Sequence, residues 1–431
     1  MNFEINNFGK IVHANIRVDG ITVVAGPNGS GKSTISRALM TWCSVIRRMG
    51  SLSLFERMKS VRDAVNEVLA AHDLASIRFP IFHDIGWASK FLVPEVWHNP
   101  EMVFKLVNRG IDSYRRRYGQ ETVALADKIV GLYDEISPRI EQIARKEDSD
   151  YASTIVEDSF NRAFDDELAS FTSSNEPGLI RSVSGSERIR SCTIERGHIV
   201  SLEGVEGNHA PLSFYLEPIH IFDFFQGSAR WSNWDLLAEN RYQAGEEDWG
   251  RLILRDVDMA QWSVERKEKH RRLERELHEI MDVIRGQMVN VDRMMKFHDL
   301  DVNADISIRN VASGAKSMAI VARGLRSGVV EPGSLLIIDE PESNLHPAWQ
   351  ISFAKFLALL ERRFDFKIFV NTHSPYFMRA IDVFSRDLQC PAERKAFYRM
   401  VGEGTHFAAD DVTANVNVVF EDLYRPLERV M

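Results

Sequence analysis

The chain has 431 residues, of which 44% are hydrophobic and 27% are charged. This balance is typical of a soluble globular protein, and the length favours more than one structural part. The formal net charge of −9 excludes a chain-wide basic coat for nucleic acid, although it leaves room for local basic patches.

The cysteine content and the termini of the chain bear on its compartment. Cys43, Cys192 and Cys390 are far apart and form no CxxC pair, so we expect reduced thiols in a cytoplasmic protein. The first ten residues lack the basic and apolar regions of a secretory signal. The apolar runs are too short to span a bilayer, so we expect no contact with a membrane.

The first half of the chain predicts strands followed by helices. Residues 21–25 form a short apolar run typical of a buried strand, and residues 33–48 predict a helix. Residues 50–170 are mostly helical by pattern, and Pro138 is expected to kink or end one of these helices.

The middle of the chain predicts a loop and then β-structure. Residues 172–187 are rich in Ser, Gly, Asn and Glu, which indicates an exposed loop. Residues 189–194 and 199–202 predict a β-hairpin that turns at Gly197, and residues 219–225 predict another buried strand.

The last part of the chain predicts one long helix and then α/β structure. Apolar residues step by three or four through residues 263–297, which predicts the longest helix of the chain. Strands are expected at 335–338 and 367–370, a helix at 351–363, and a hairpin around residues 402–404.

These elements suggest two structural parts. Residues 1–49 and 216–431 are expected to build one discontinuous α/β head. Residues 50–215 are expected to form a mostly helical insertion with a small β-hairpin.

A phosphate-binding loop is predicted directly after the strand at 21–25. The segment fits the pattern GxxxxGK[ST] and consists of Gly26, Pro27, Asn28, Gly29, Ser30, Gly31, Lys32, Ser33 and Thr34. Small residues let the backbone N–H groups surround a phosphate, and the following helix N-terminus adds partial positive charge. Lys32 is expected to reach the β and γ phosphates of a nucleotide, and the Ser33 hydroxyl is expected to bind Mg²⁺.

Two acids follow the expected strand at 335–338. A buried strand brings Asp339 and Glu340 to its C-terminal end, where ligands bind in parallel α/β sheets. Asp339 is expected to hold Mg²⁺, directly or through water, and Glu340 to polarise the attacking water. A solvated turn is the alternative, and the phosphate loop in the same chain favours the catalytic interpretation.

Two further segments carry polar groups suited to an anion. Ser313 and Gly314 precede the acidic strand, and a Ser-Gly pair that opens a helix offers a hydroxyl and free N–H groups, although it is also a common helix cap. His373 follows the strand at 367–370 and could reach the γ-phosphate of a nucleotide or simply occupy a turn.

The order of these motifs resembles the ABC-type ATPases of the SMC, RecF and OLD group. The motifs are the phosphate loop, Ser-Gly-x-Lys-Ser, Asp-Glu-Pro-Glu, Asn-Leu-His-Pro and Thr-His-Ser-Pro-Tyr. They are most similar to those of the OLD-like ATPases of prokaryotes, some of which serve in anti-phage systems such as PARIS and Septu. The resemblance covers residues 1–45 and about 300–431, and it implies an α/β P-loop NTPase of ABC-ATPase type that uses ATP and Mg²⁺.

The resemblance also implies roles for individual residues. Ser313 and Gly314 would contact the γ-phosphate bound to another subunit, so at least a homodimer is expected. His373 would be the switch histidine, and residues 343–347 would form a dimer-contact loop. Gln226 is the candidate for the glutamine that contacts Mg²⁺ and the attacking water in this group.

The chain departs from the OLD nucleases after the last motif. It ends 58 residues beyond His373, which leaves no room for their Toprim nuclease domain. We therefore expect a sensor or scaffold in anti-phage defence that controls a separate effector, a nuclease or a toxin. A DNA-repair or chromosome-maintenance ATPase that clamps DNA is the first alternative. A transporter ATPase subunit comes last, because about 280 residues separate Lys32 from Ser313.

Contact with DNA has one further candidate in the sequence. Residues 115–117 are three arginines between Tyr114 and Tyr118, and such a patch suits nucleic acid as well as a solvated helix face. The tryptophans at 231, 234 and 249 favour packing in a core or an interface over the stacking of bases.

Overall fold

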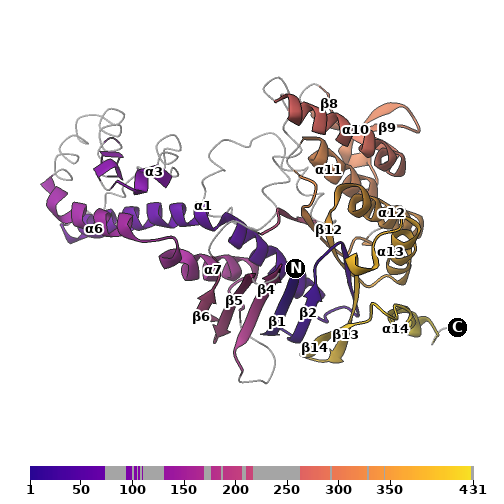
Figure 1. Ribbon diagram of the computed structural model, residues 1–431, viewed down its shortest axis with the longest axis horizontal. Coiled ribbons are helices and arrows are strands. Elements are labelled where there is room, and N and C mark those ends of the chain that lie inside the picture. Colours follow the sequence, from indigo (N-terminus) through magenta and orange to yellow (C-terminus); the bar gives the residue numbers. More distant parts are fainter. Residues whose placement is uncertain are drawn as a thin grey trace.

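The computed structural model describes most of the chain as a large sheet with helices on both faces and a helical arm (Figure 1). The residues that it describes are 1–72, 94–99, 101–103, 105–106, 109, 131–168, 176–185, 188–205, 210–216, 263–291, 294–327, 330–343 and 345–428. None of the helices in these residues is long and apolar enough to cross a membrane.

The large sheet has 11 strands in the order β6-β5-β4-β1-β2-β14-β13-β3-β12-β11-β7. The strands are β1 (Asn2–Phe8), β2 (Ile11–Arg17), β3 (Ile21–Ala25), β4 (Gly178–Ser184), β5 (Arg188–Glu195), β6 (His198–Glu203), β7 (Ser213–Leu216), β11 (Leu335–Asp339), β12 (Lys367–Thr372), β13 (Lys395–Glu403) and β14 (His406–Asp411). The five strands from β13 to β7 are mutually parallel, so their C-terminal ends share one edge.

Helices cover both faces of the parallel strands (Figure 1). The described helices are α1 (Lys32–Ala71), α3 (Pro94–Trp97), α6 (Tyr133–Arg145), α7 (Ser149–Ala163), α10 (Val264–Ile284), α11 (Ser313–Ser327), α12 (Pro347–Phe364), α13 (Pro375–Asp387) and α14 (Asn417–Glu428). Of these, α3 and α6 belong to the arm and do not cover the sheet. One core packs Leu336 and Val370 of the sheet against α10 to α13, and the other packs Ile337 and Phe369 against α1 and α7. Burial on both faces explains why β3 and β11 are buried throughout and rich in Val, Ile and Leu.

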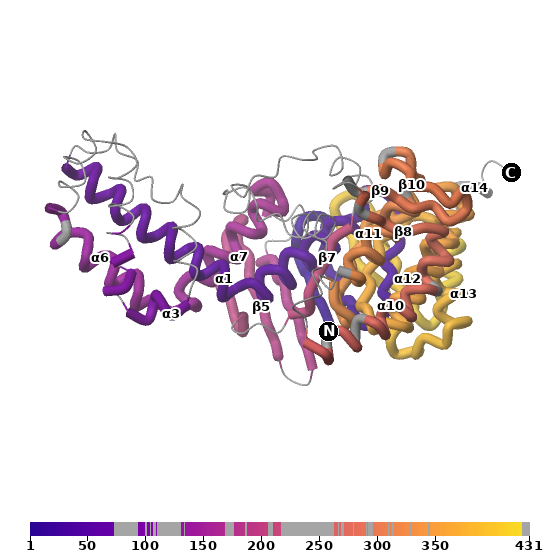
Figure 2. The backbone as a smooth tube through the Cα atoms, turned by 90° about the horizontal axis from the view of Figure 1, so that it is seen from above, coloured from indigo at the N-terminus to yellow at the C-terminus, as the bar shows by residue number. Residues whose placement is uncertain are grey.

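The arm is built on the helix that follows the phosphate loop (Figure 2). The helix α1 has 40 residues, far more than the expected 33–48, and spans about 60 Å at 1.5 Å per residue. Its second half packs against α3 and α6 in a small core of its own. Pro138 lies inside α6 and does not end it, because buried neighbours such as Ile136 and Ile140 hold the helix against α1.

The loop expected at residues 172–187 is wrong, because residues 178–184 form β4 and pair with β1. The expected hairpin is confirmed as β5 and β6, with Gly197 at a φ angle of 84° in the turn. Through β4 the hairpin belongs to the large sheet. The division of the chain into head and insertion stays a prediction.

The long helix expected at residues 263–297 is also wrong in its second half. The helix α10 ends at Ile284, where Arg285 adopts a φ angle of 59°. A three-stranded sheet follows, formed by β8 (Gly286–Val291), β9 (Met294–Asp299) and β10 (Ala304–Ser307). The apolar steps misled the helix prediction because Met288 and Phe297 fill the same core from strands as Ile284 does from the helix.

The other expected elements of the last part are confirmed. The strands at 335–338 and 367–370 are β11 and β12, and the helix at 351–363 lies within α12. The hairpin around residues 402–404 is formed by β13 and β14. The strand expected at 219–225 and the arginines at 115–117 lie outside the described residues, as do the three tryptophans considered with them.

Candidate active site

The phosphate loop joins β3 to α1 at the C-terminal edge of the parallel strands. Gly29 and Gly31 have φ angles of 75° and 89°, which residues with a side chain rarely adopt. A Cβ atom at Gly31 would also lie 2.4 Å from Cδ1 of Ile11 on β2. The buried hydroxyl of Ser30 has no hydrogen-bond partner among the described residues. The loop is therefore a tight backbone cradle.

Lys32 opens α1 and is only 4% exposed. Its Nζ donates hydrogen bonds to the carbonyl oxygens of Gly26, at 3.0 Å, and Pro27, at 2.9 Å. Burial lowers the pKa of Lys32, and nearby carboxylates oppose this shift, those of Glu340, Asp339 and Glu342. The phosphate loop that carries Lys32 therefore lies close to the acids at the end of β11.

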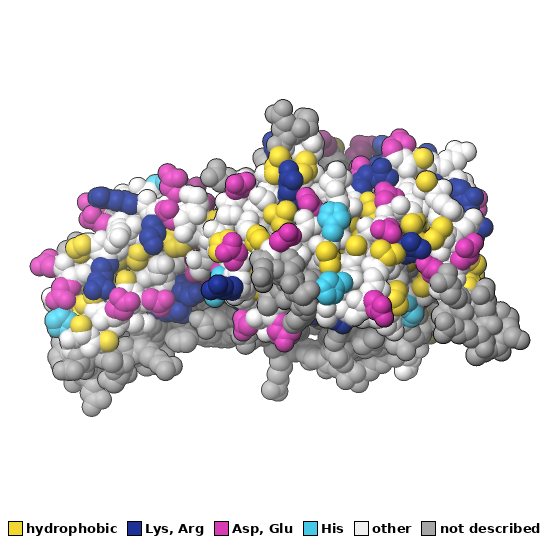
Figure 3. Space-filling model, turned by 90° about the horizontal axis from the view of Figure 1, so that it is seen from below, with side chains coloured by type: hydrophobic (Ala, Val, Ile, Leu, Met, Phe, Trp, Pro, Cys, Tyr) yellow, Lys and Arg dark blue, Asp and Glu magenta, His cyan; other side chains and the backbone are white. Residues whose placement is uncertain are grey.

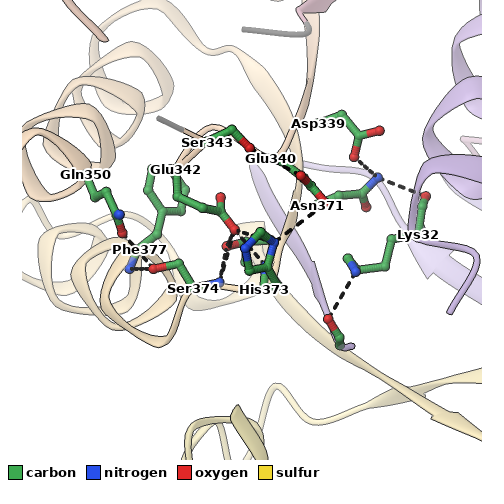
Figure 4. A network of polar contacts seen from close by, with 12 residues as sticks. Lys32, Asp339, Glu340, Glu342, Ser343, Gln350, Asn371, His373, Ser374 and Phe377 are labelled. Atoms are coloured by element: carbon green, nitrogen blue, oxygen red, sulfur yellow. Dashed lines mark hydrogen bonds and ion pairs between the residues drawn. The ribbon is translucent and has the colours of Figure 1, made fainter. Parts of the chain in front are cut away.

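Asp339 is buried at the end of β11 and is held by Tyr215 and by Asn371, the second of which Figure 4 shows. Its Oδ2 accepts a hydrogen bond from the Tyr215 hydroxyl, and its Oδ1 accepts one from Asn371 Nδ2, both at 2.9 Å. The same Nδ2 atom lies 2.8 Å from the Lys32 carbonyl oxygen and 2.9 Å from Ser36 Oγ. Asn371 therefore connects β12 and the buried carboxylate to the first turns of α1.

Glu340 differs from its neighbour in its surroundings. Its φ angle is 49°, and its backbone N–H donates to the carbonyl oxygen of Asn371 at 3.0 Å. The side chain is 36% exposed, and Oε2 accepts a hydrogen bond from Ser343 Oγ at 3.2 Å. The two consecutive acids thus offer one buried, fixed carboxylate and one that is accessible to water.

His373 lies directly after β12, and its side chain is 40% exposed. Its Nδ1 atom is 3.6 Å from Oε1 of Glu340 and 3.3 Å from Oε1 of Glu342 (Figure 4). The structure therefore brings together Lys32, Asp339, Glu340 and His373, four of the residues singled out from the sequence.

The sequence reasoning missed three residues that hold this site. Asn371 and Glu342 lie inside motifs that the sequence showed, immediately beside His373 and Glu340, and this proximity was the available signal. Tyr215 lies 124 residues before Asp339, so nothing in the local sequence connects the two.

Ser313 and Gly314 begin α11. The nearest atoms to a Cβ at Gly314 belong to Leu345, at 3.1 Å, and Trp349, at 3.6 Å. The N-terminus of α11 thus lies against the loop before α12 and the first turn of that helix. Gln226 lies outside the described residues.

The residues of the loop and of the strand ends fit Mg-ATP. The left-handed Gly31 and the free hydroxyl of Ser30 suit a phosphate, and Lys32 supplies a cation beside them. Ser33 is half-buried on the first turn of α1, and the hydroxyl of Ser33 and the carboxylate of Asp339 are oxygen donors of the type that Mg²⁺ prefers.

Parallel strands, a phosphate loop between β3 and α1, and acids at the end of the neighbouring strand define the class: this is a P-loop NTPase of ABC-ATPase type. A family model described as "AAA domain, putative AbiEii toxin, Type IV TA system" matches residues 157–379. This match covers more than half of the chain, which therefore belongs to that family. A second AAA domain model matches residues 2–50, which contain the phosphate loop.

Solved structures similar to the chain include heads of SMC proteins. The SMC head domain from Thermotoga maritima is 11% identical, covers 95% of this chain and 98% of its own, and has a TM-score of 0.41. The same identity and TM-score are found for an Smc head domain with an extended coiled coil, bound to the C-terminal domain of ScpA, from Pyrococcus furiosus, with coverage of 100% and 98%. No curated protein matches the chain.

Proposed function

We propose that the chain hydrolyses ATP with Mg²⁺ in a site that a second copy of the chain completes. One observation carries the proposal: Lys32, Asp339, Glu340 and His373 meet at one edge of the sheet. Membership of an AAA domain family supports the nucleotide as ligand.

The residues divide the chemistry among them. The backbone of the phosphate loop and Lys32 bind the β and γ phosphates, so the developing charge on the phosphoryl group is met by a cation. Glu340 orients the attacking water, and its exposure and its hydrogen bond to Ser343 support this role. His373, 3.6 Å from Glu340, contacts the γ-phosphate.

Ser33 and Asp339 are the proposed ligands of Mg²⁺, with Gln226 as a further candidate. Magnesium, when bound, neutralises charge on the phosphate oxygens. Tyr215 and Asn371 fix both oxygens of Asp339, so the carboxylate is oriented before the ion arrives.

Replacing Glu340 tests hydrolysis itself. The variant Glu340→Gln keeps the size of the side chain and both hydrogen bonds of Lys32, so it should bind ATP with near wild-type affinity. Loss of the base should slow turnover by at least about 100-fold, and the protein should accumulate as an ATP-bound oligomer on size exclusion. Unchanged turnover would remove Glu340 from the mechanism.

The composite site is proposed from the position of Ser313 and Gly314. Among the described contacts, Gly314 at the start of α11 packs against Leu345 and Trp349, and none joins it to Lys32; we propose that this helix start acts on the nucleotide of the other subunit. The loop at 343–347 adjoins them and is the proposed dimer contact.

Mixing two inactive variants tests this arrangement. Lys32→Ala removes one half-site and Ser313→Arg the other, so each heterodimer keeps one intact site of two. With random pairing at equal amounts, about half of the dimers are mixed, and activity should return to about a quarter of wild type. The absence of recovery at any mixing ratio, with both variants folded, would contradict a shared site.

The helical arm is proposed as an insertion into the ATPase head. The two family models match residues 2–50 and 157–379, and the segment between them contains the second half of α1 and α6. Because β4 to β7 belong to the large sheet, the head includes them.

For the biological role, we propose an ATP-driven sensor or scaffold in anti-phage defence that controls a separate effector, a nuclease or a toxin. The resemblance to OLD-like ATPases supports this role, and so does the family description, which names a toxin of a toxin–antitoxin system. A RecF- or SMC-like clamp on DNA is the alternative.

The charge pattern of the described part of the arm favours a protein partner over DNA. Among the described residues of the arm, basic side chains pair with acids, as in Arg139–Glu67 and Arg145–Glu141. On the face shown in Figure 3, basic and acidic side chains are interspersed rather than gathered by sign. ATP turnover measured with and without duplex DNA, at low and high salt, separates the two roles. Stimulation that falls steeply with salt would favour the clamp.

A further inference from the structure

We propose that Glu342 is a positioning residue that fixes His373 relative to Glu340 for the hydrolysis of ATP. The inference rests on the proposed function for its catalytic consequence. It concerns the carboxylate two residues after the water-orienting acid and the segment Thr372, His373 and Ser374, where the chain leaves β12 and enters α13.

A single oxygen of Glu342 gathers the donors of this segment. Its Oε1 accepts hydrogen bonds from Thr372 Oγ1 and the His373 backbone N–H, both at 2.7 Å, and from the Ser374 N–H at 3.0 Å. Two consecutive N–H groups that point at one anion form a nest, a concavity specific for negative oxygen. The conformation of the backbone at His373 is therefore set by the carboxylate of Glu342.

The remaining contacts of the segment complete the fixation (Figure 4). Ser374 Oγ donates to Gln350 Oε1 at 2.6 Å and accepts from the Phe377 N–H at 3.2 Å, which caps α13. Gln350 Nε2 in turn donates to the carbonyl oxygen of Leu345 at 3.1 Å. The network thus reaches Leu345, which is also the neighbour of Gly314.

The imidazole is the part of the segment that this network leaves accessible. The His373 side chain is 40% exposed while that of Glu342 is 4% exposed, and Nδ1 faces both Glu342 and Glu340. Glu342 and Glu340 belong to the same turn, and Glu342 binds the backbone at His373. The carboxylate of Glu342 therefore fixes the distance between Glu340 and His373.

The burial of Glu342 is costly for the fold. Its Oε2 has no hydrogen-bond partner among the described residues, and burial raises the pKa of this carboxyl against the hydrogen bonds that lower it. An unsatisfied buried oxygen destabilises the folded state, so this carboxylate is not explained by stability alone.

Hydrogen exchange tests the positioning without any turnover. In Glu342→Ala the amide of His373 loses its acceptor and the amide of Ser374 keeps only Thr372 Oγ1, at 3.0 Å. Exchange of a peptide spanning residues 371–376 should therefore speed up at least tenfold without nucleotide. In Glu342→Gln one oxygen still accepts both bonds, and exchange should stay near wild type. Wild-type exchange in Glu342→Ala would overturn the proposal, whether or not the protein hydrolyses ATP.

Kinetics test the consequence for the site. Glu342→Ala should lower kcat by about 10- to 100-fold, as for other residues that orient a functional group, while KM for ATP changes less than about twofold. Glu342→Gln should recover most of the turnover. In a His373→Ala background, Glu342→Ala should cause no further loss, because it acts through the histidine. Multiplicative losses in the double variant would overturn the proposal.

Glu361 offers a matched control. It is a buried carboxylate on α12, and its Oε1 pairs with Arg394 Nε at 3.0 Å. Among the contacts of the described residues, none joins it to Lys32, Glu340 or His373. Glu361→Ala should lower the midpoint of unfolding but leave kcat of the folded protein unchanged; an equal fall in kcat would overturn the specific role of Glu342. Exchange could be faster in Glu342→Ala, as expected, while the wild-type protein shows no turnover. That pair of results would refute the proposed function and leave the positioning of His373 in place.

Discussion

Replacing Asn371 by leucine should loosen the junction between the phosphate loop and the acidic strand. Leucine has nearly the same branched shape, so the variant removes the amide without opening a cavity. The Nδ2 atom has two N–H groups to share among three acceptors, on Asp339, Lys32 and Ser36. A bond to a charged group contributes about 1.5–3 kcal/mol and a neutral one about 0.5–1.5 kcal/mol, which gives a loss of roughly 2–4 kcal/mol.

Two assays measure the consequences of losing these hydrogen bonds. Urea unfolding should show a lower midpoint at an unchanged slope. ATP affinity measured with Mg²⁺ should weaken by about 10- to 100-fold, because Asp339 loses one of its two orienting donors, whereas affinity in EDTA should change little. A loss of affinity that appears only with Mg²⁺ would show that the variant disturbs the metal ligand Asp339 and leaves the phosphate loop intact.

Thr22→Val is the matched control for this experiment. Thr22 is fully buried on β3 and donates to the carbonyl oxygen of Arg17 at 2.8 Å, away from Asp339. Its loss should cost about 1 kcal/mol and leave Mg-ATP binding intact. An Asn371→Leu protein with wild-type stability and wild-type Mg-ATP affinity would refute the reasoning.

Three further predictions concern the loop and the thiols. Lys32→Ala should abolish ATP binding in calorimetry, and wild-type affinity would remove Lys32 from the site. Gly31→Ala should destabilise the protein by about 1–3 kcal/mol and weaken ATP binding, because φ is 89° and the new Cβ would meet Ile11. Gly50→Ala is the control: it has open space around it inside α1 and should stabilise the protein by about 1 kcal/mol. Equal unfolding midpoints of the two variants would contradict this. Burial raises the pKa of Cys43, Cys192 and Cys390 to about 12, so these thiols stay protonated at about pH 8. They should react with iodoacetamide only after unfolding. Detection of labelled native protein by mass spectrometry would contradict their burial.

The sequence alone located the elements whose pattern is local. β3 and β11 are apolar runs that end at the loop and at the acids, so both were predicted together with the chemistry beside them. Local patterns failed where another segment decides the structure. Residues 178–184 become β4 because β1 offers an edge to pair with, and residues 286–299 become strands because Arg285 turns the chain.

The same division holds for the candidate site. Lys32, Asp339, Glu340 and His373 were found because each belongs to a short contiguous motif whose chemistry constrains neighbouring residues. The groups that orient them were decided by the tertiary structure: Tyr215 reaches Asp339 only because β7 pairs with β11, and Asn371 reaches Lys32 only because β12 lies between β11 and β3. Contiguous residues record what a ligand requires, whereas a buried hydrogen bond between distant strands depends on the order of the strands in the sheet, which no local pattern contains.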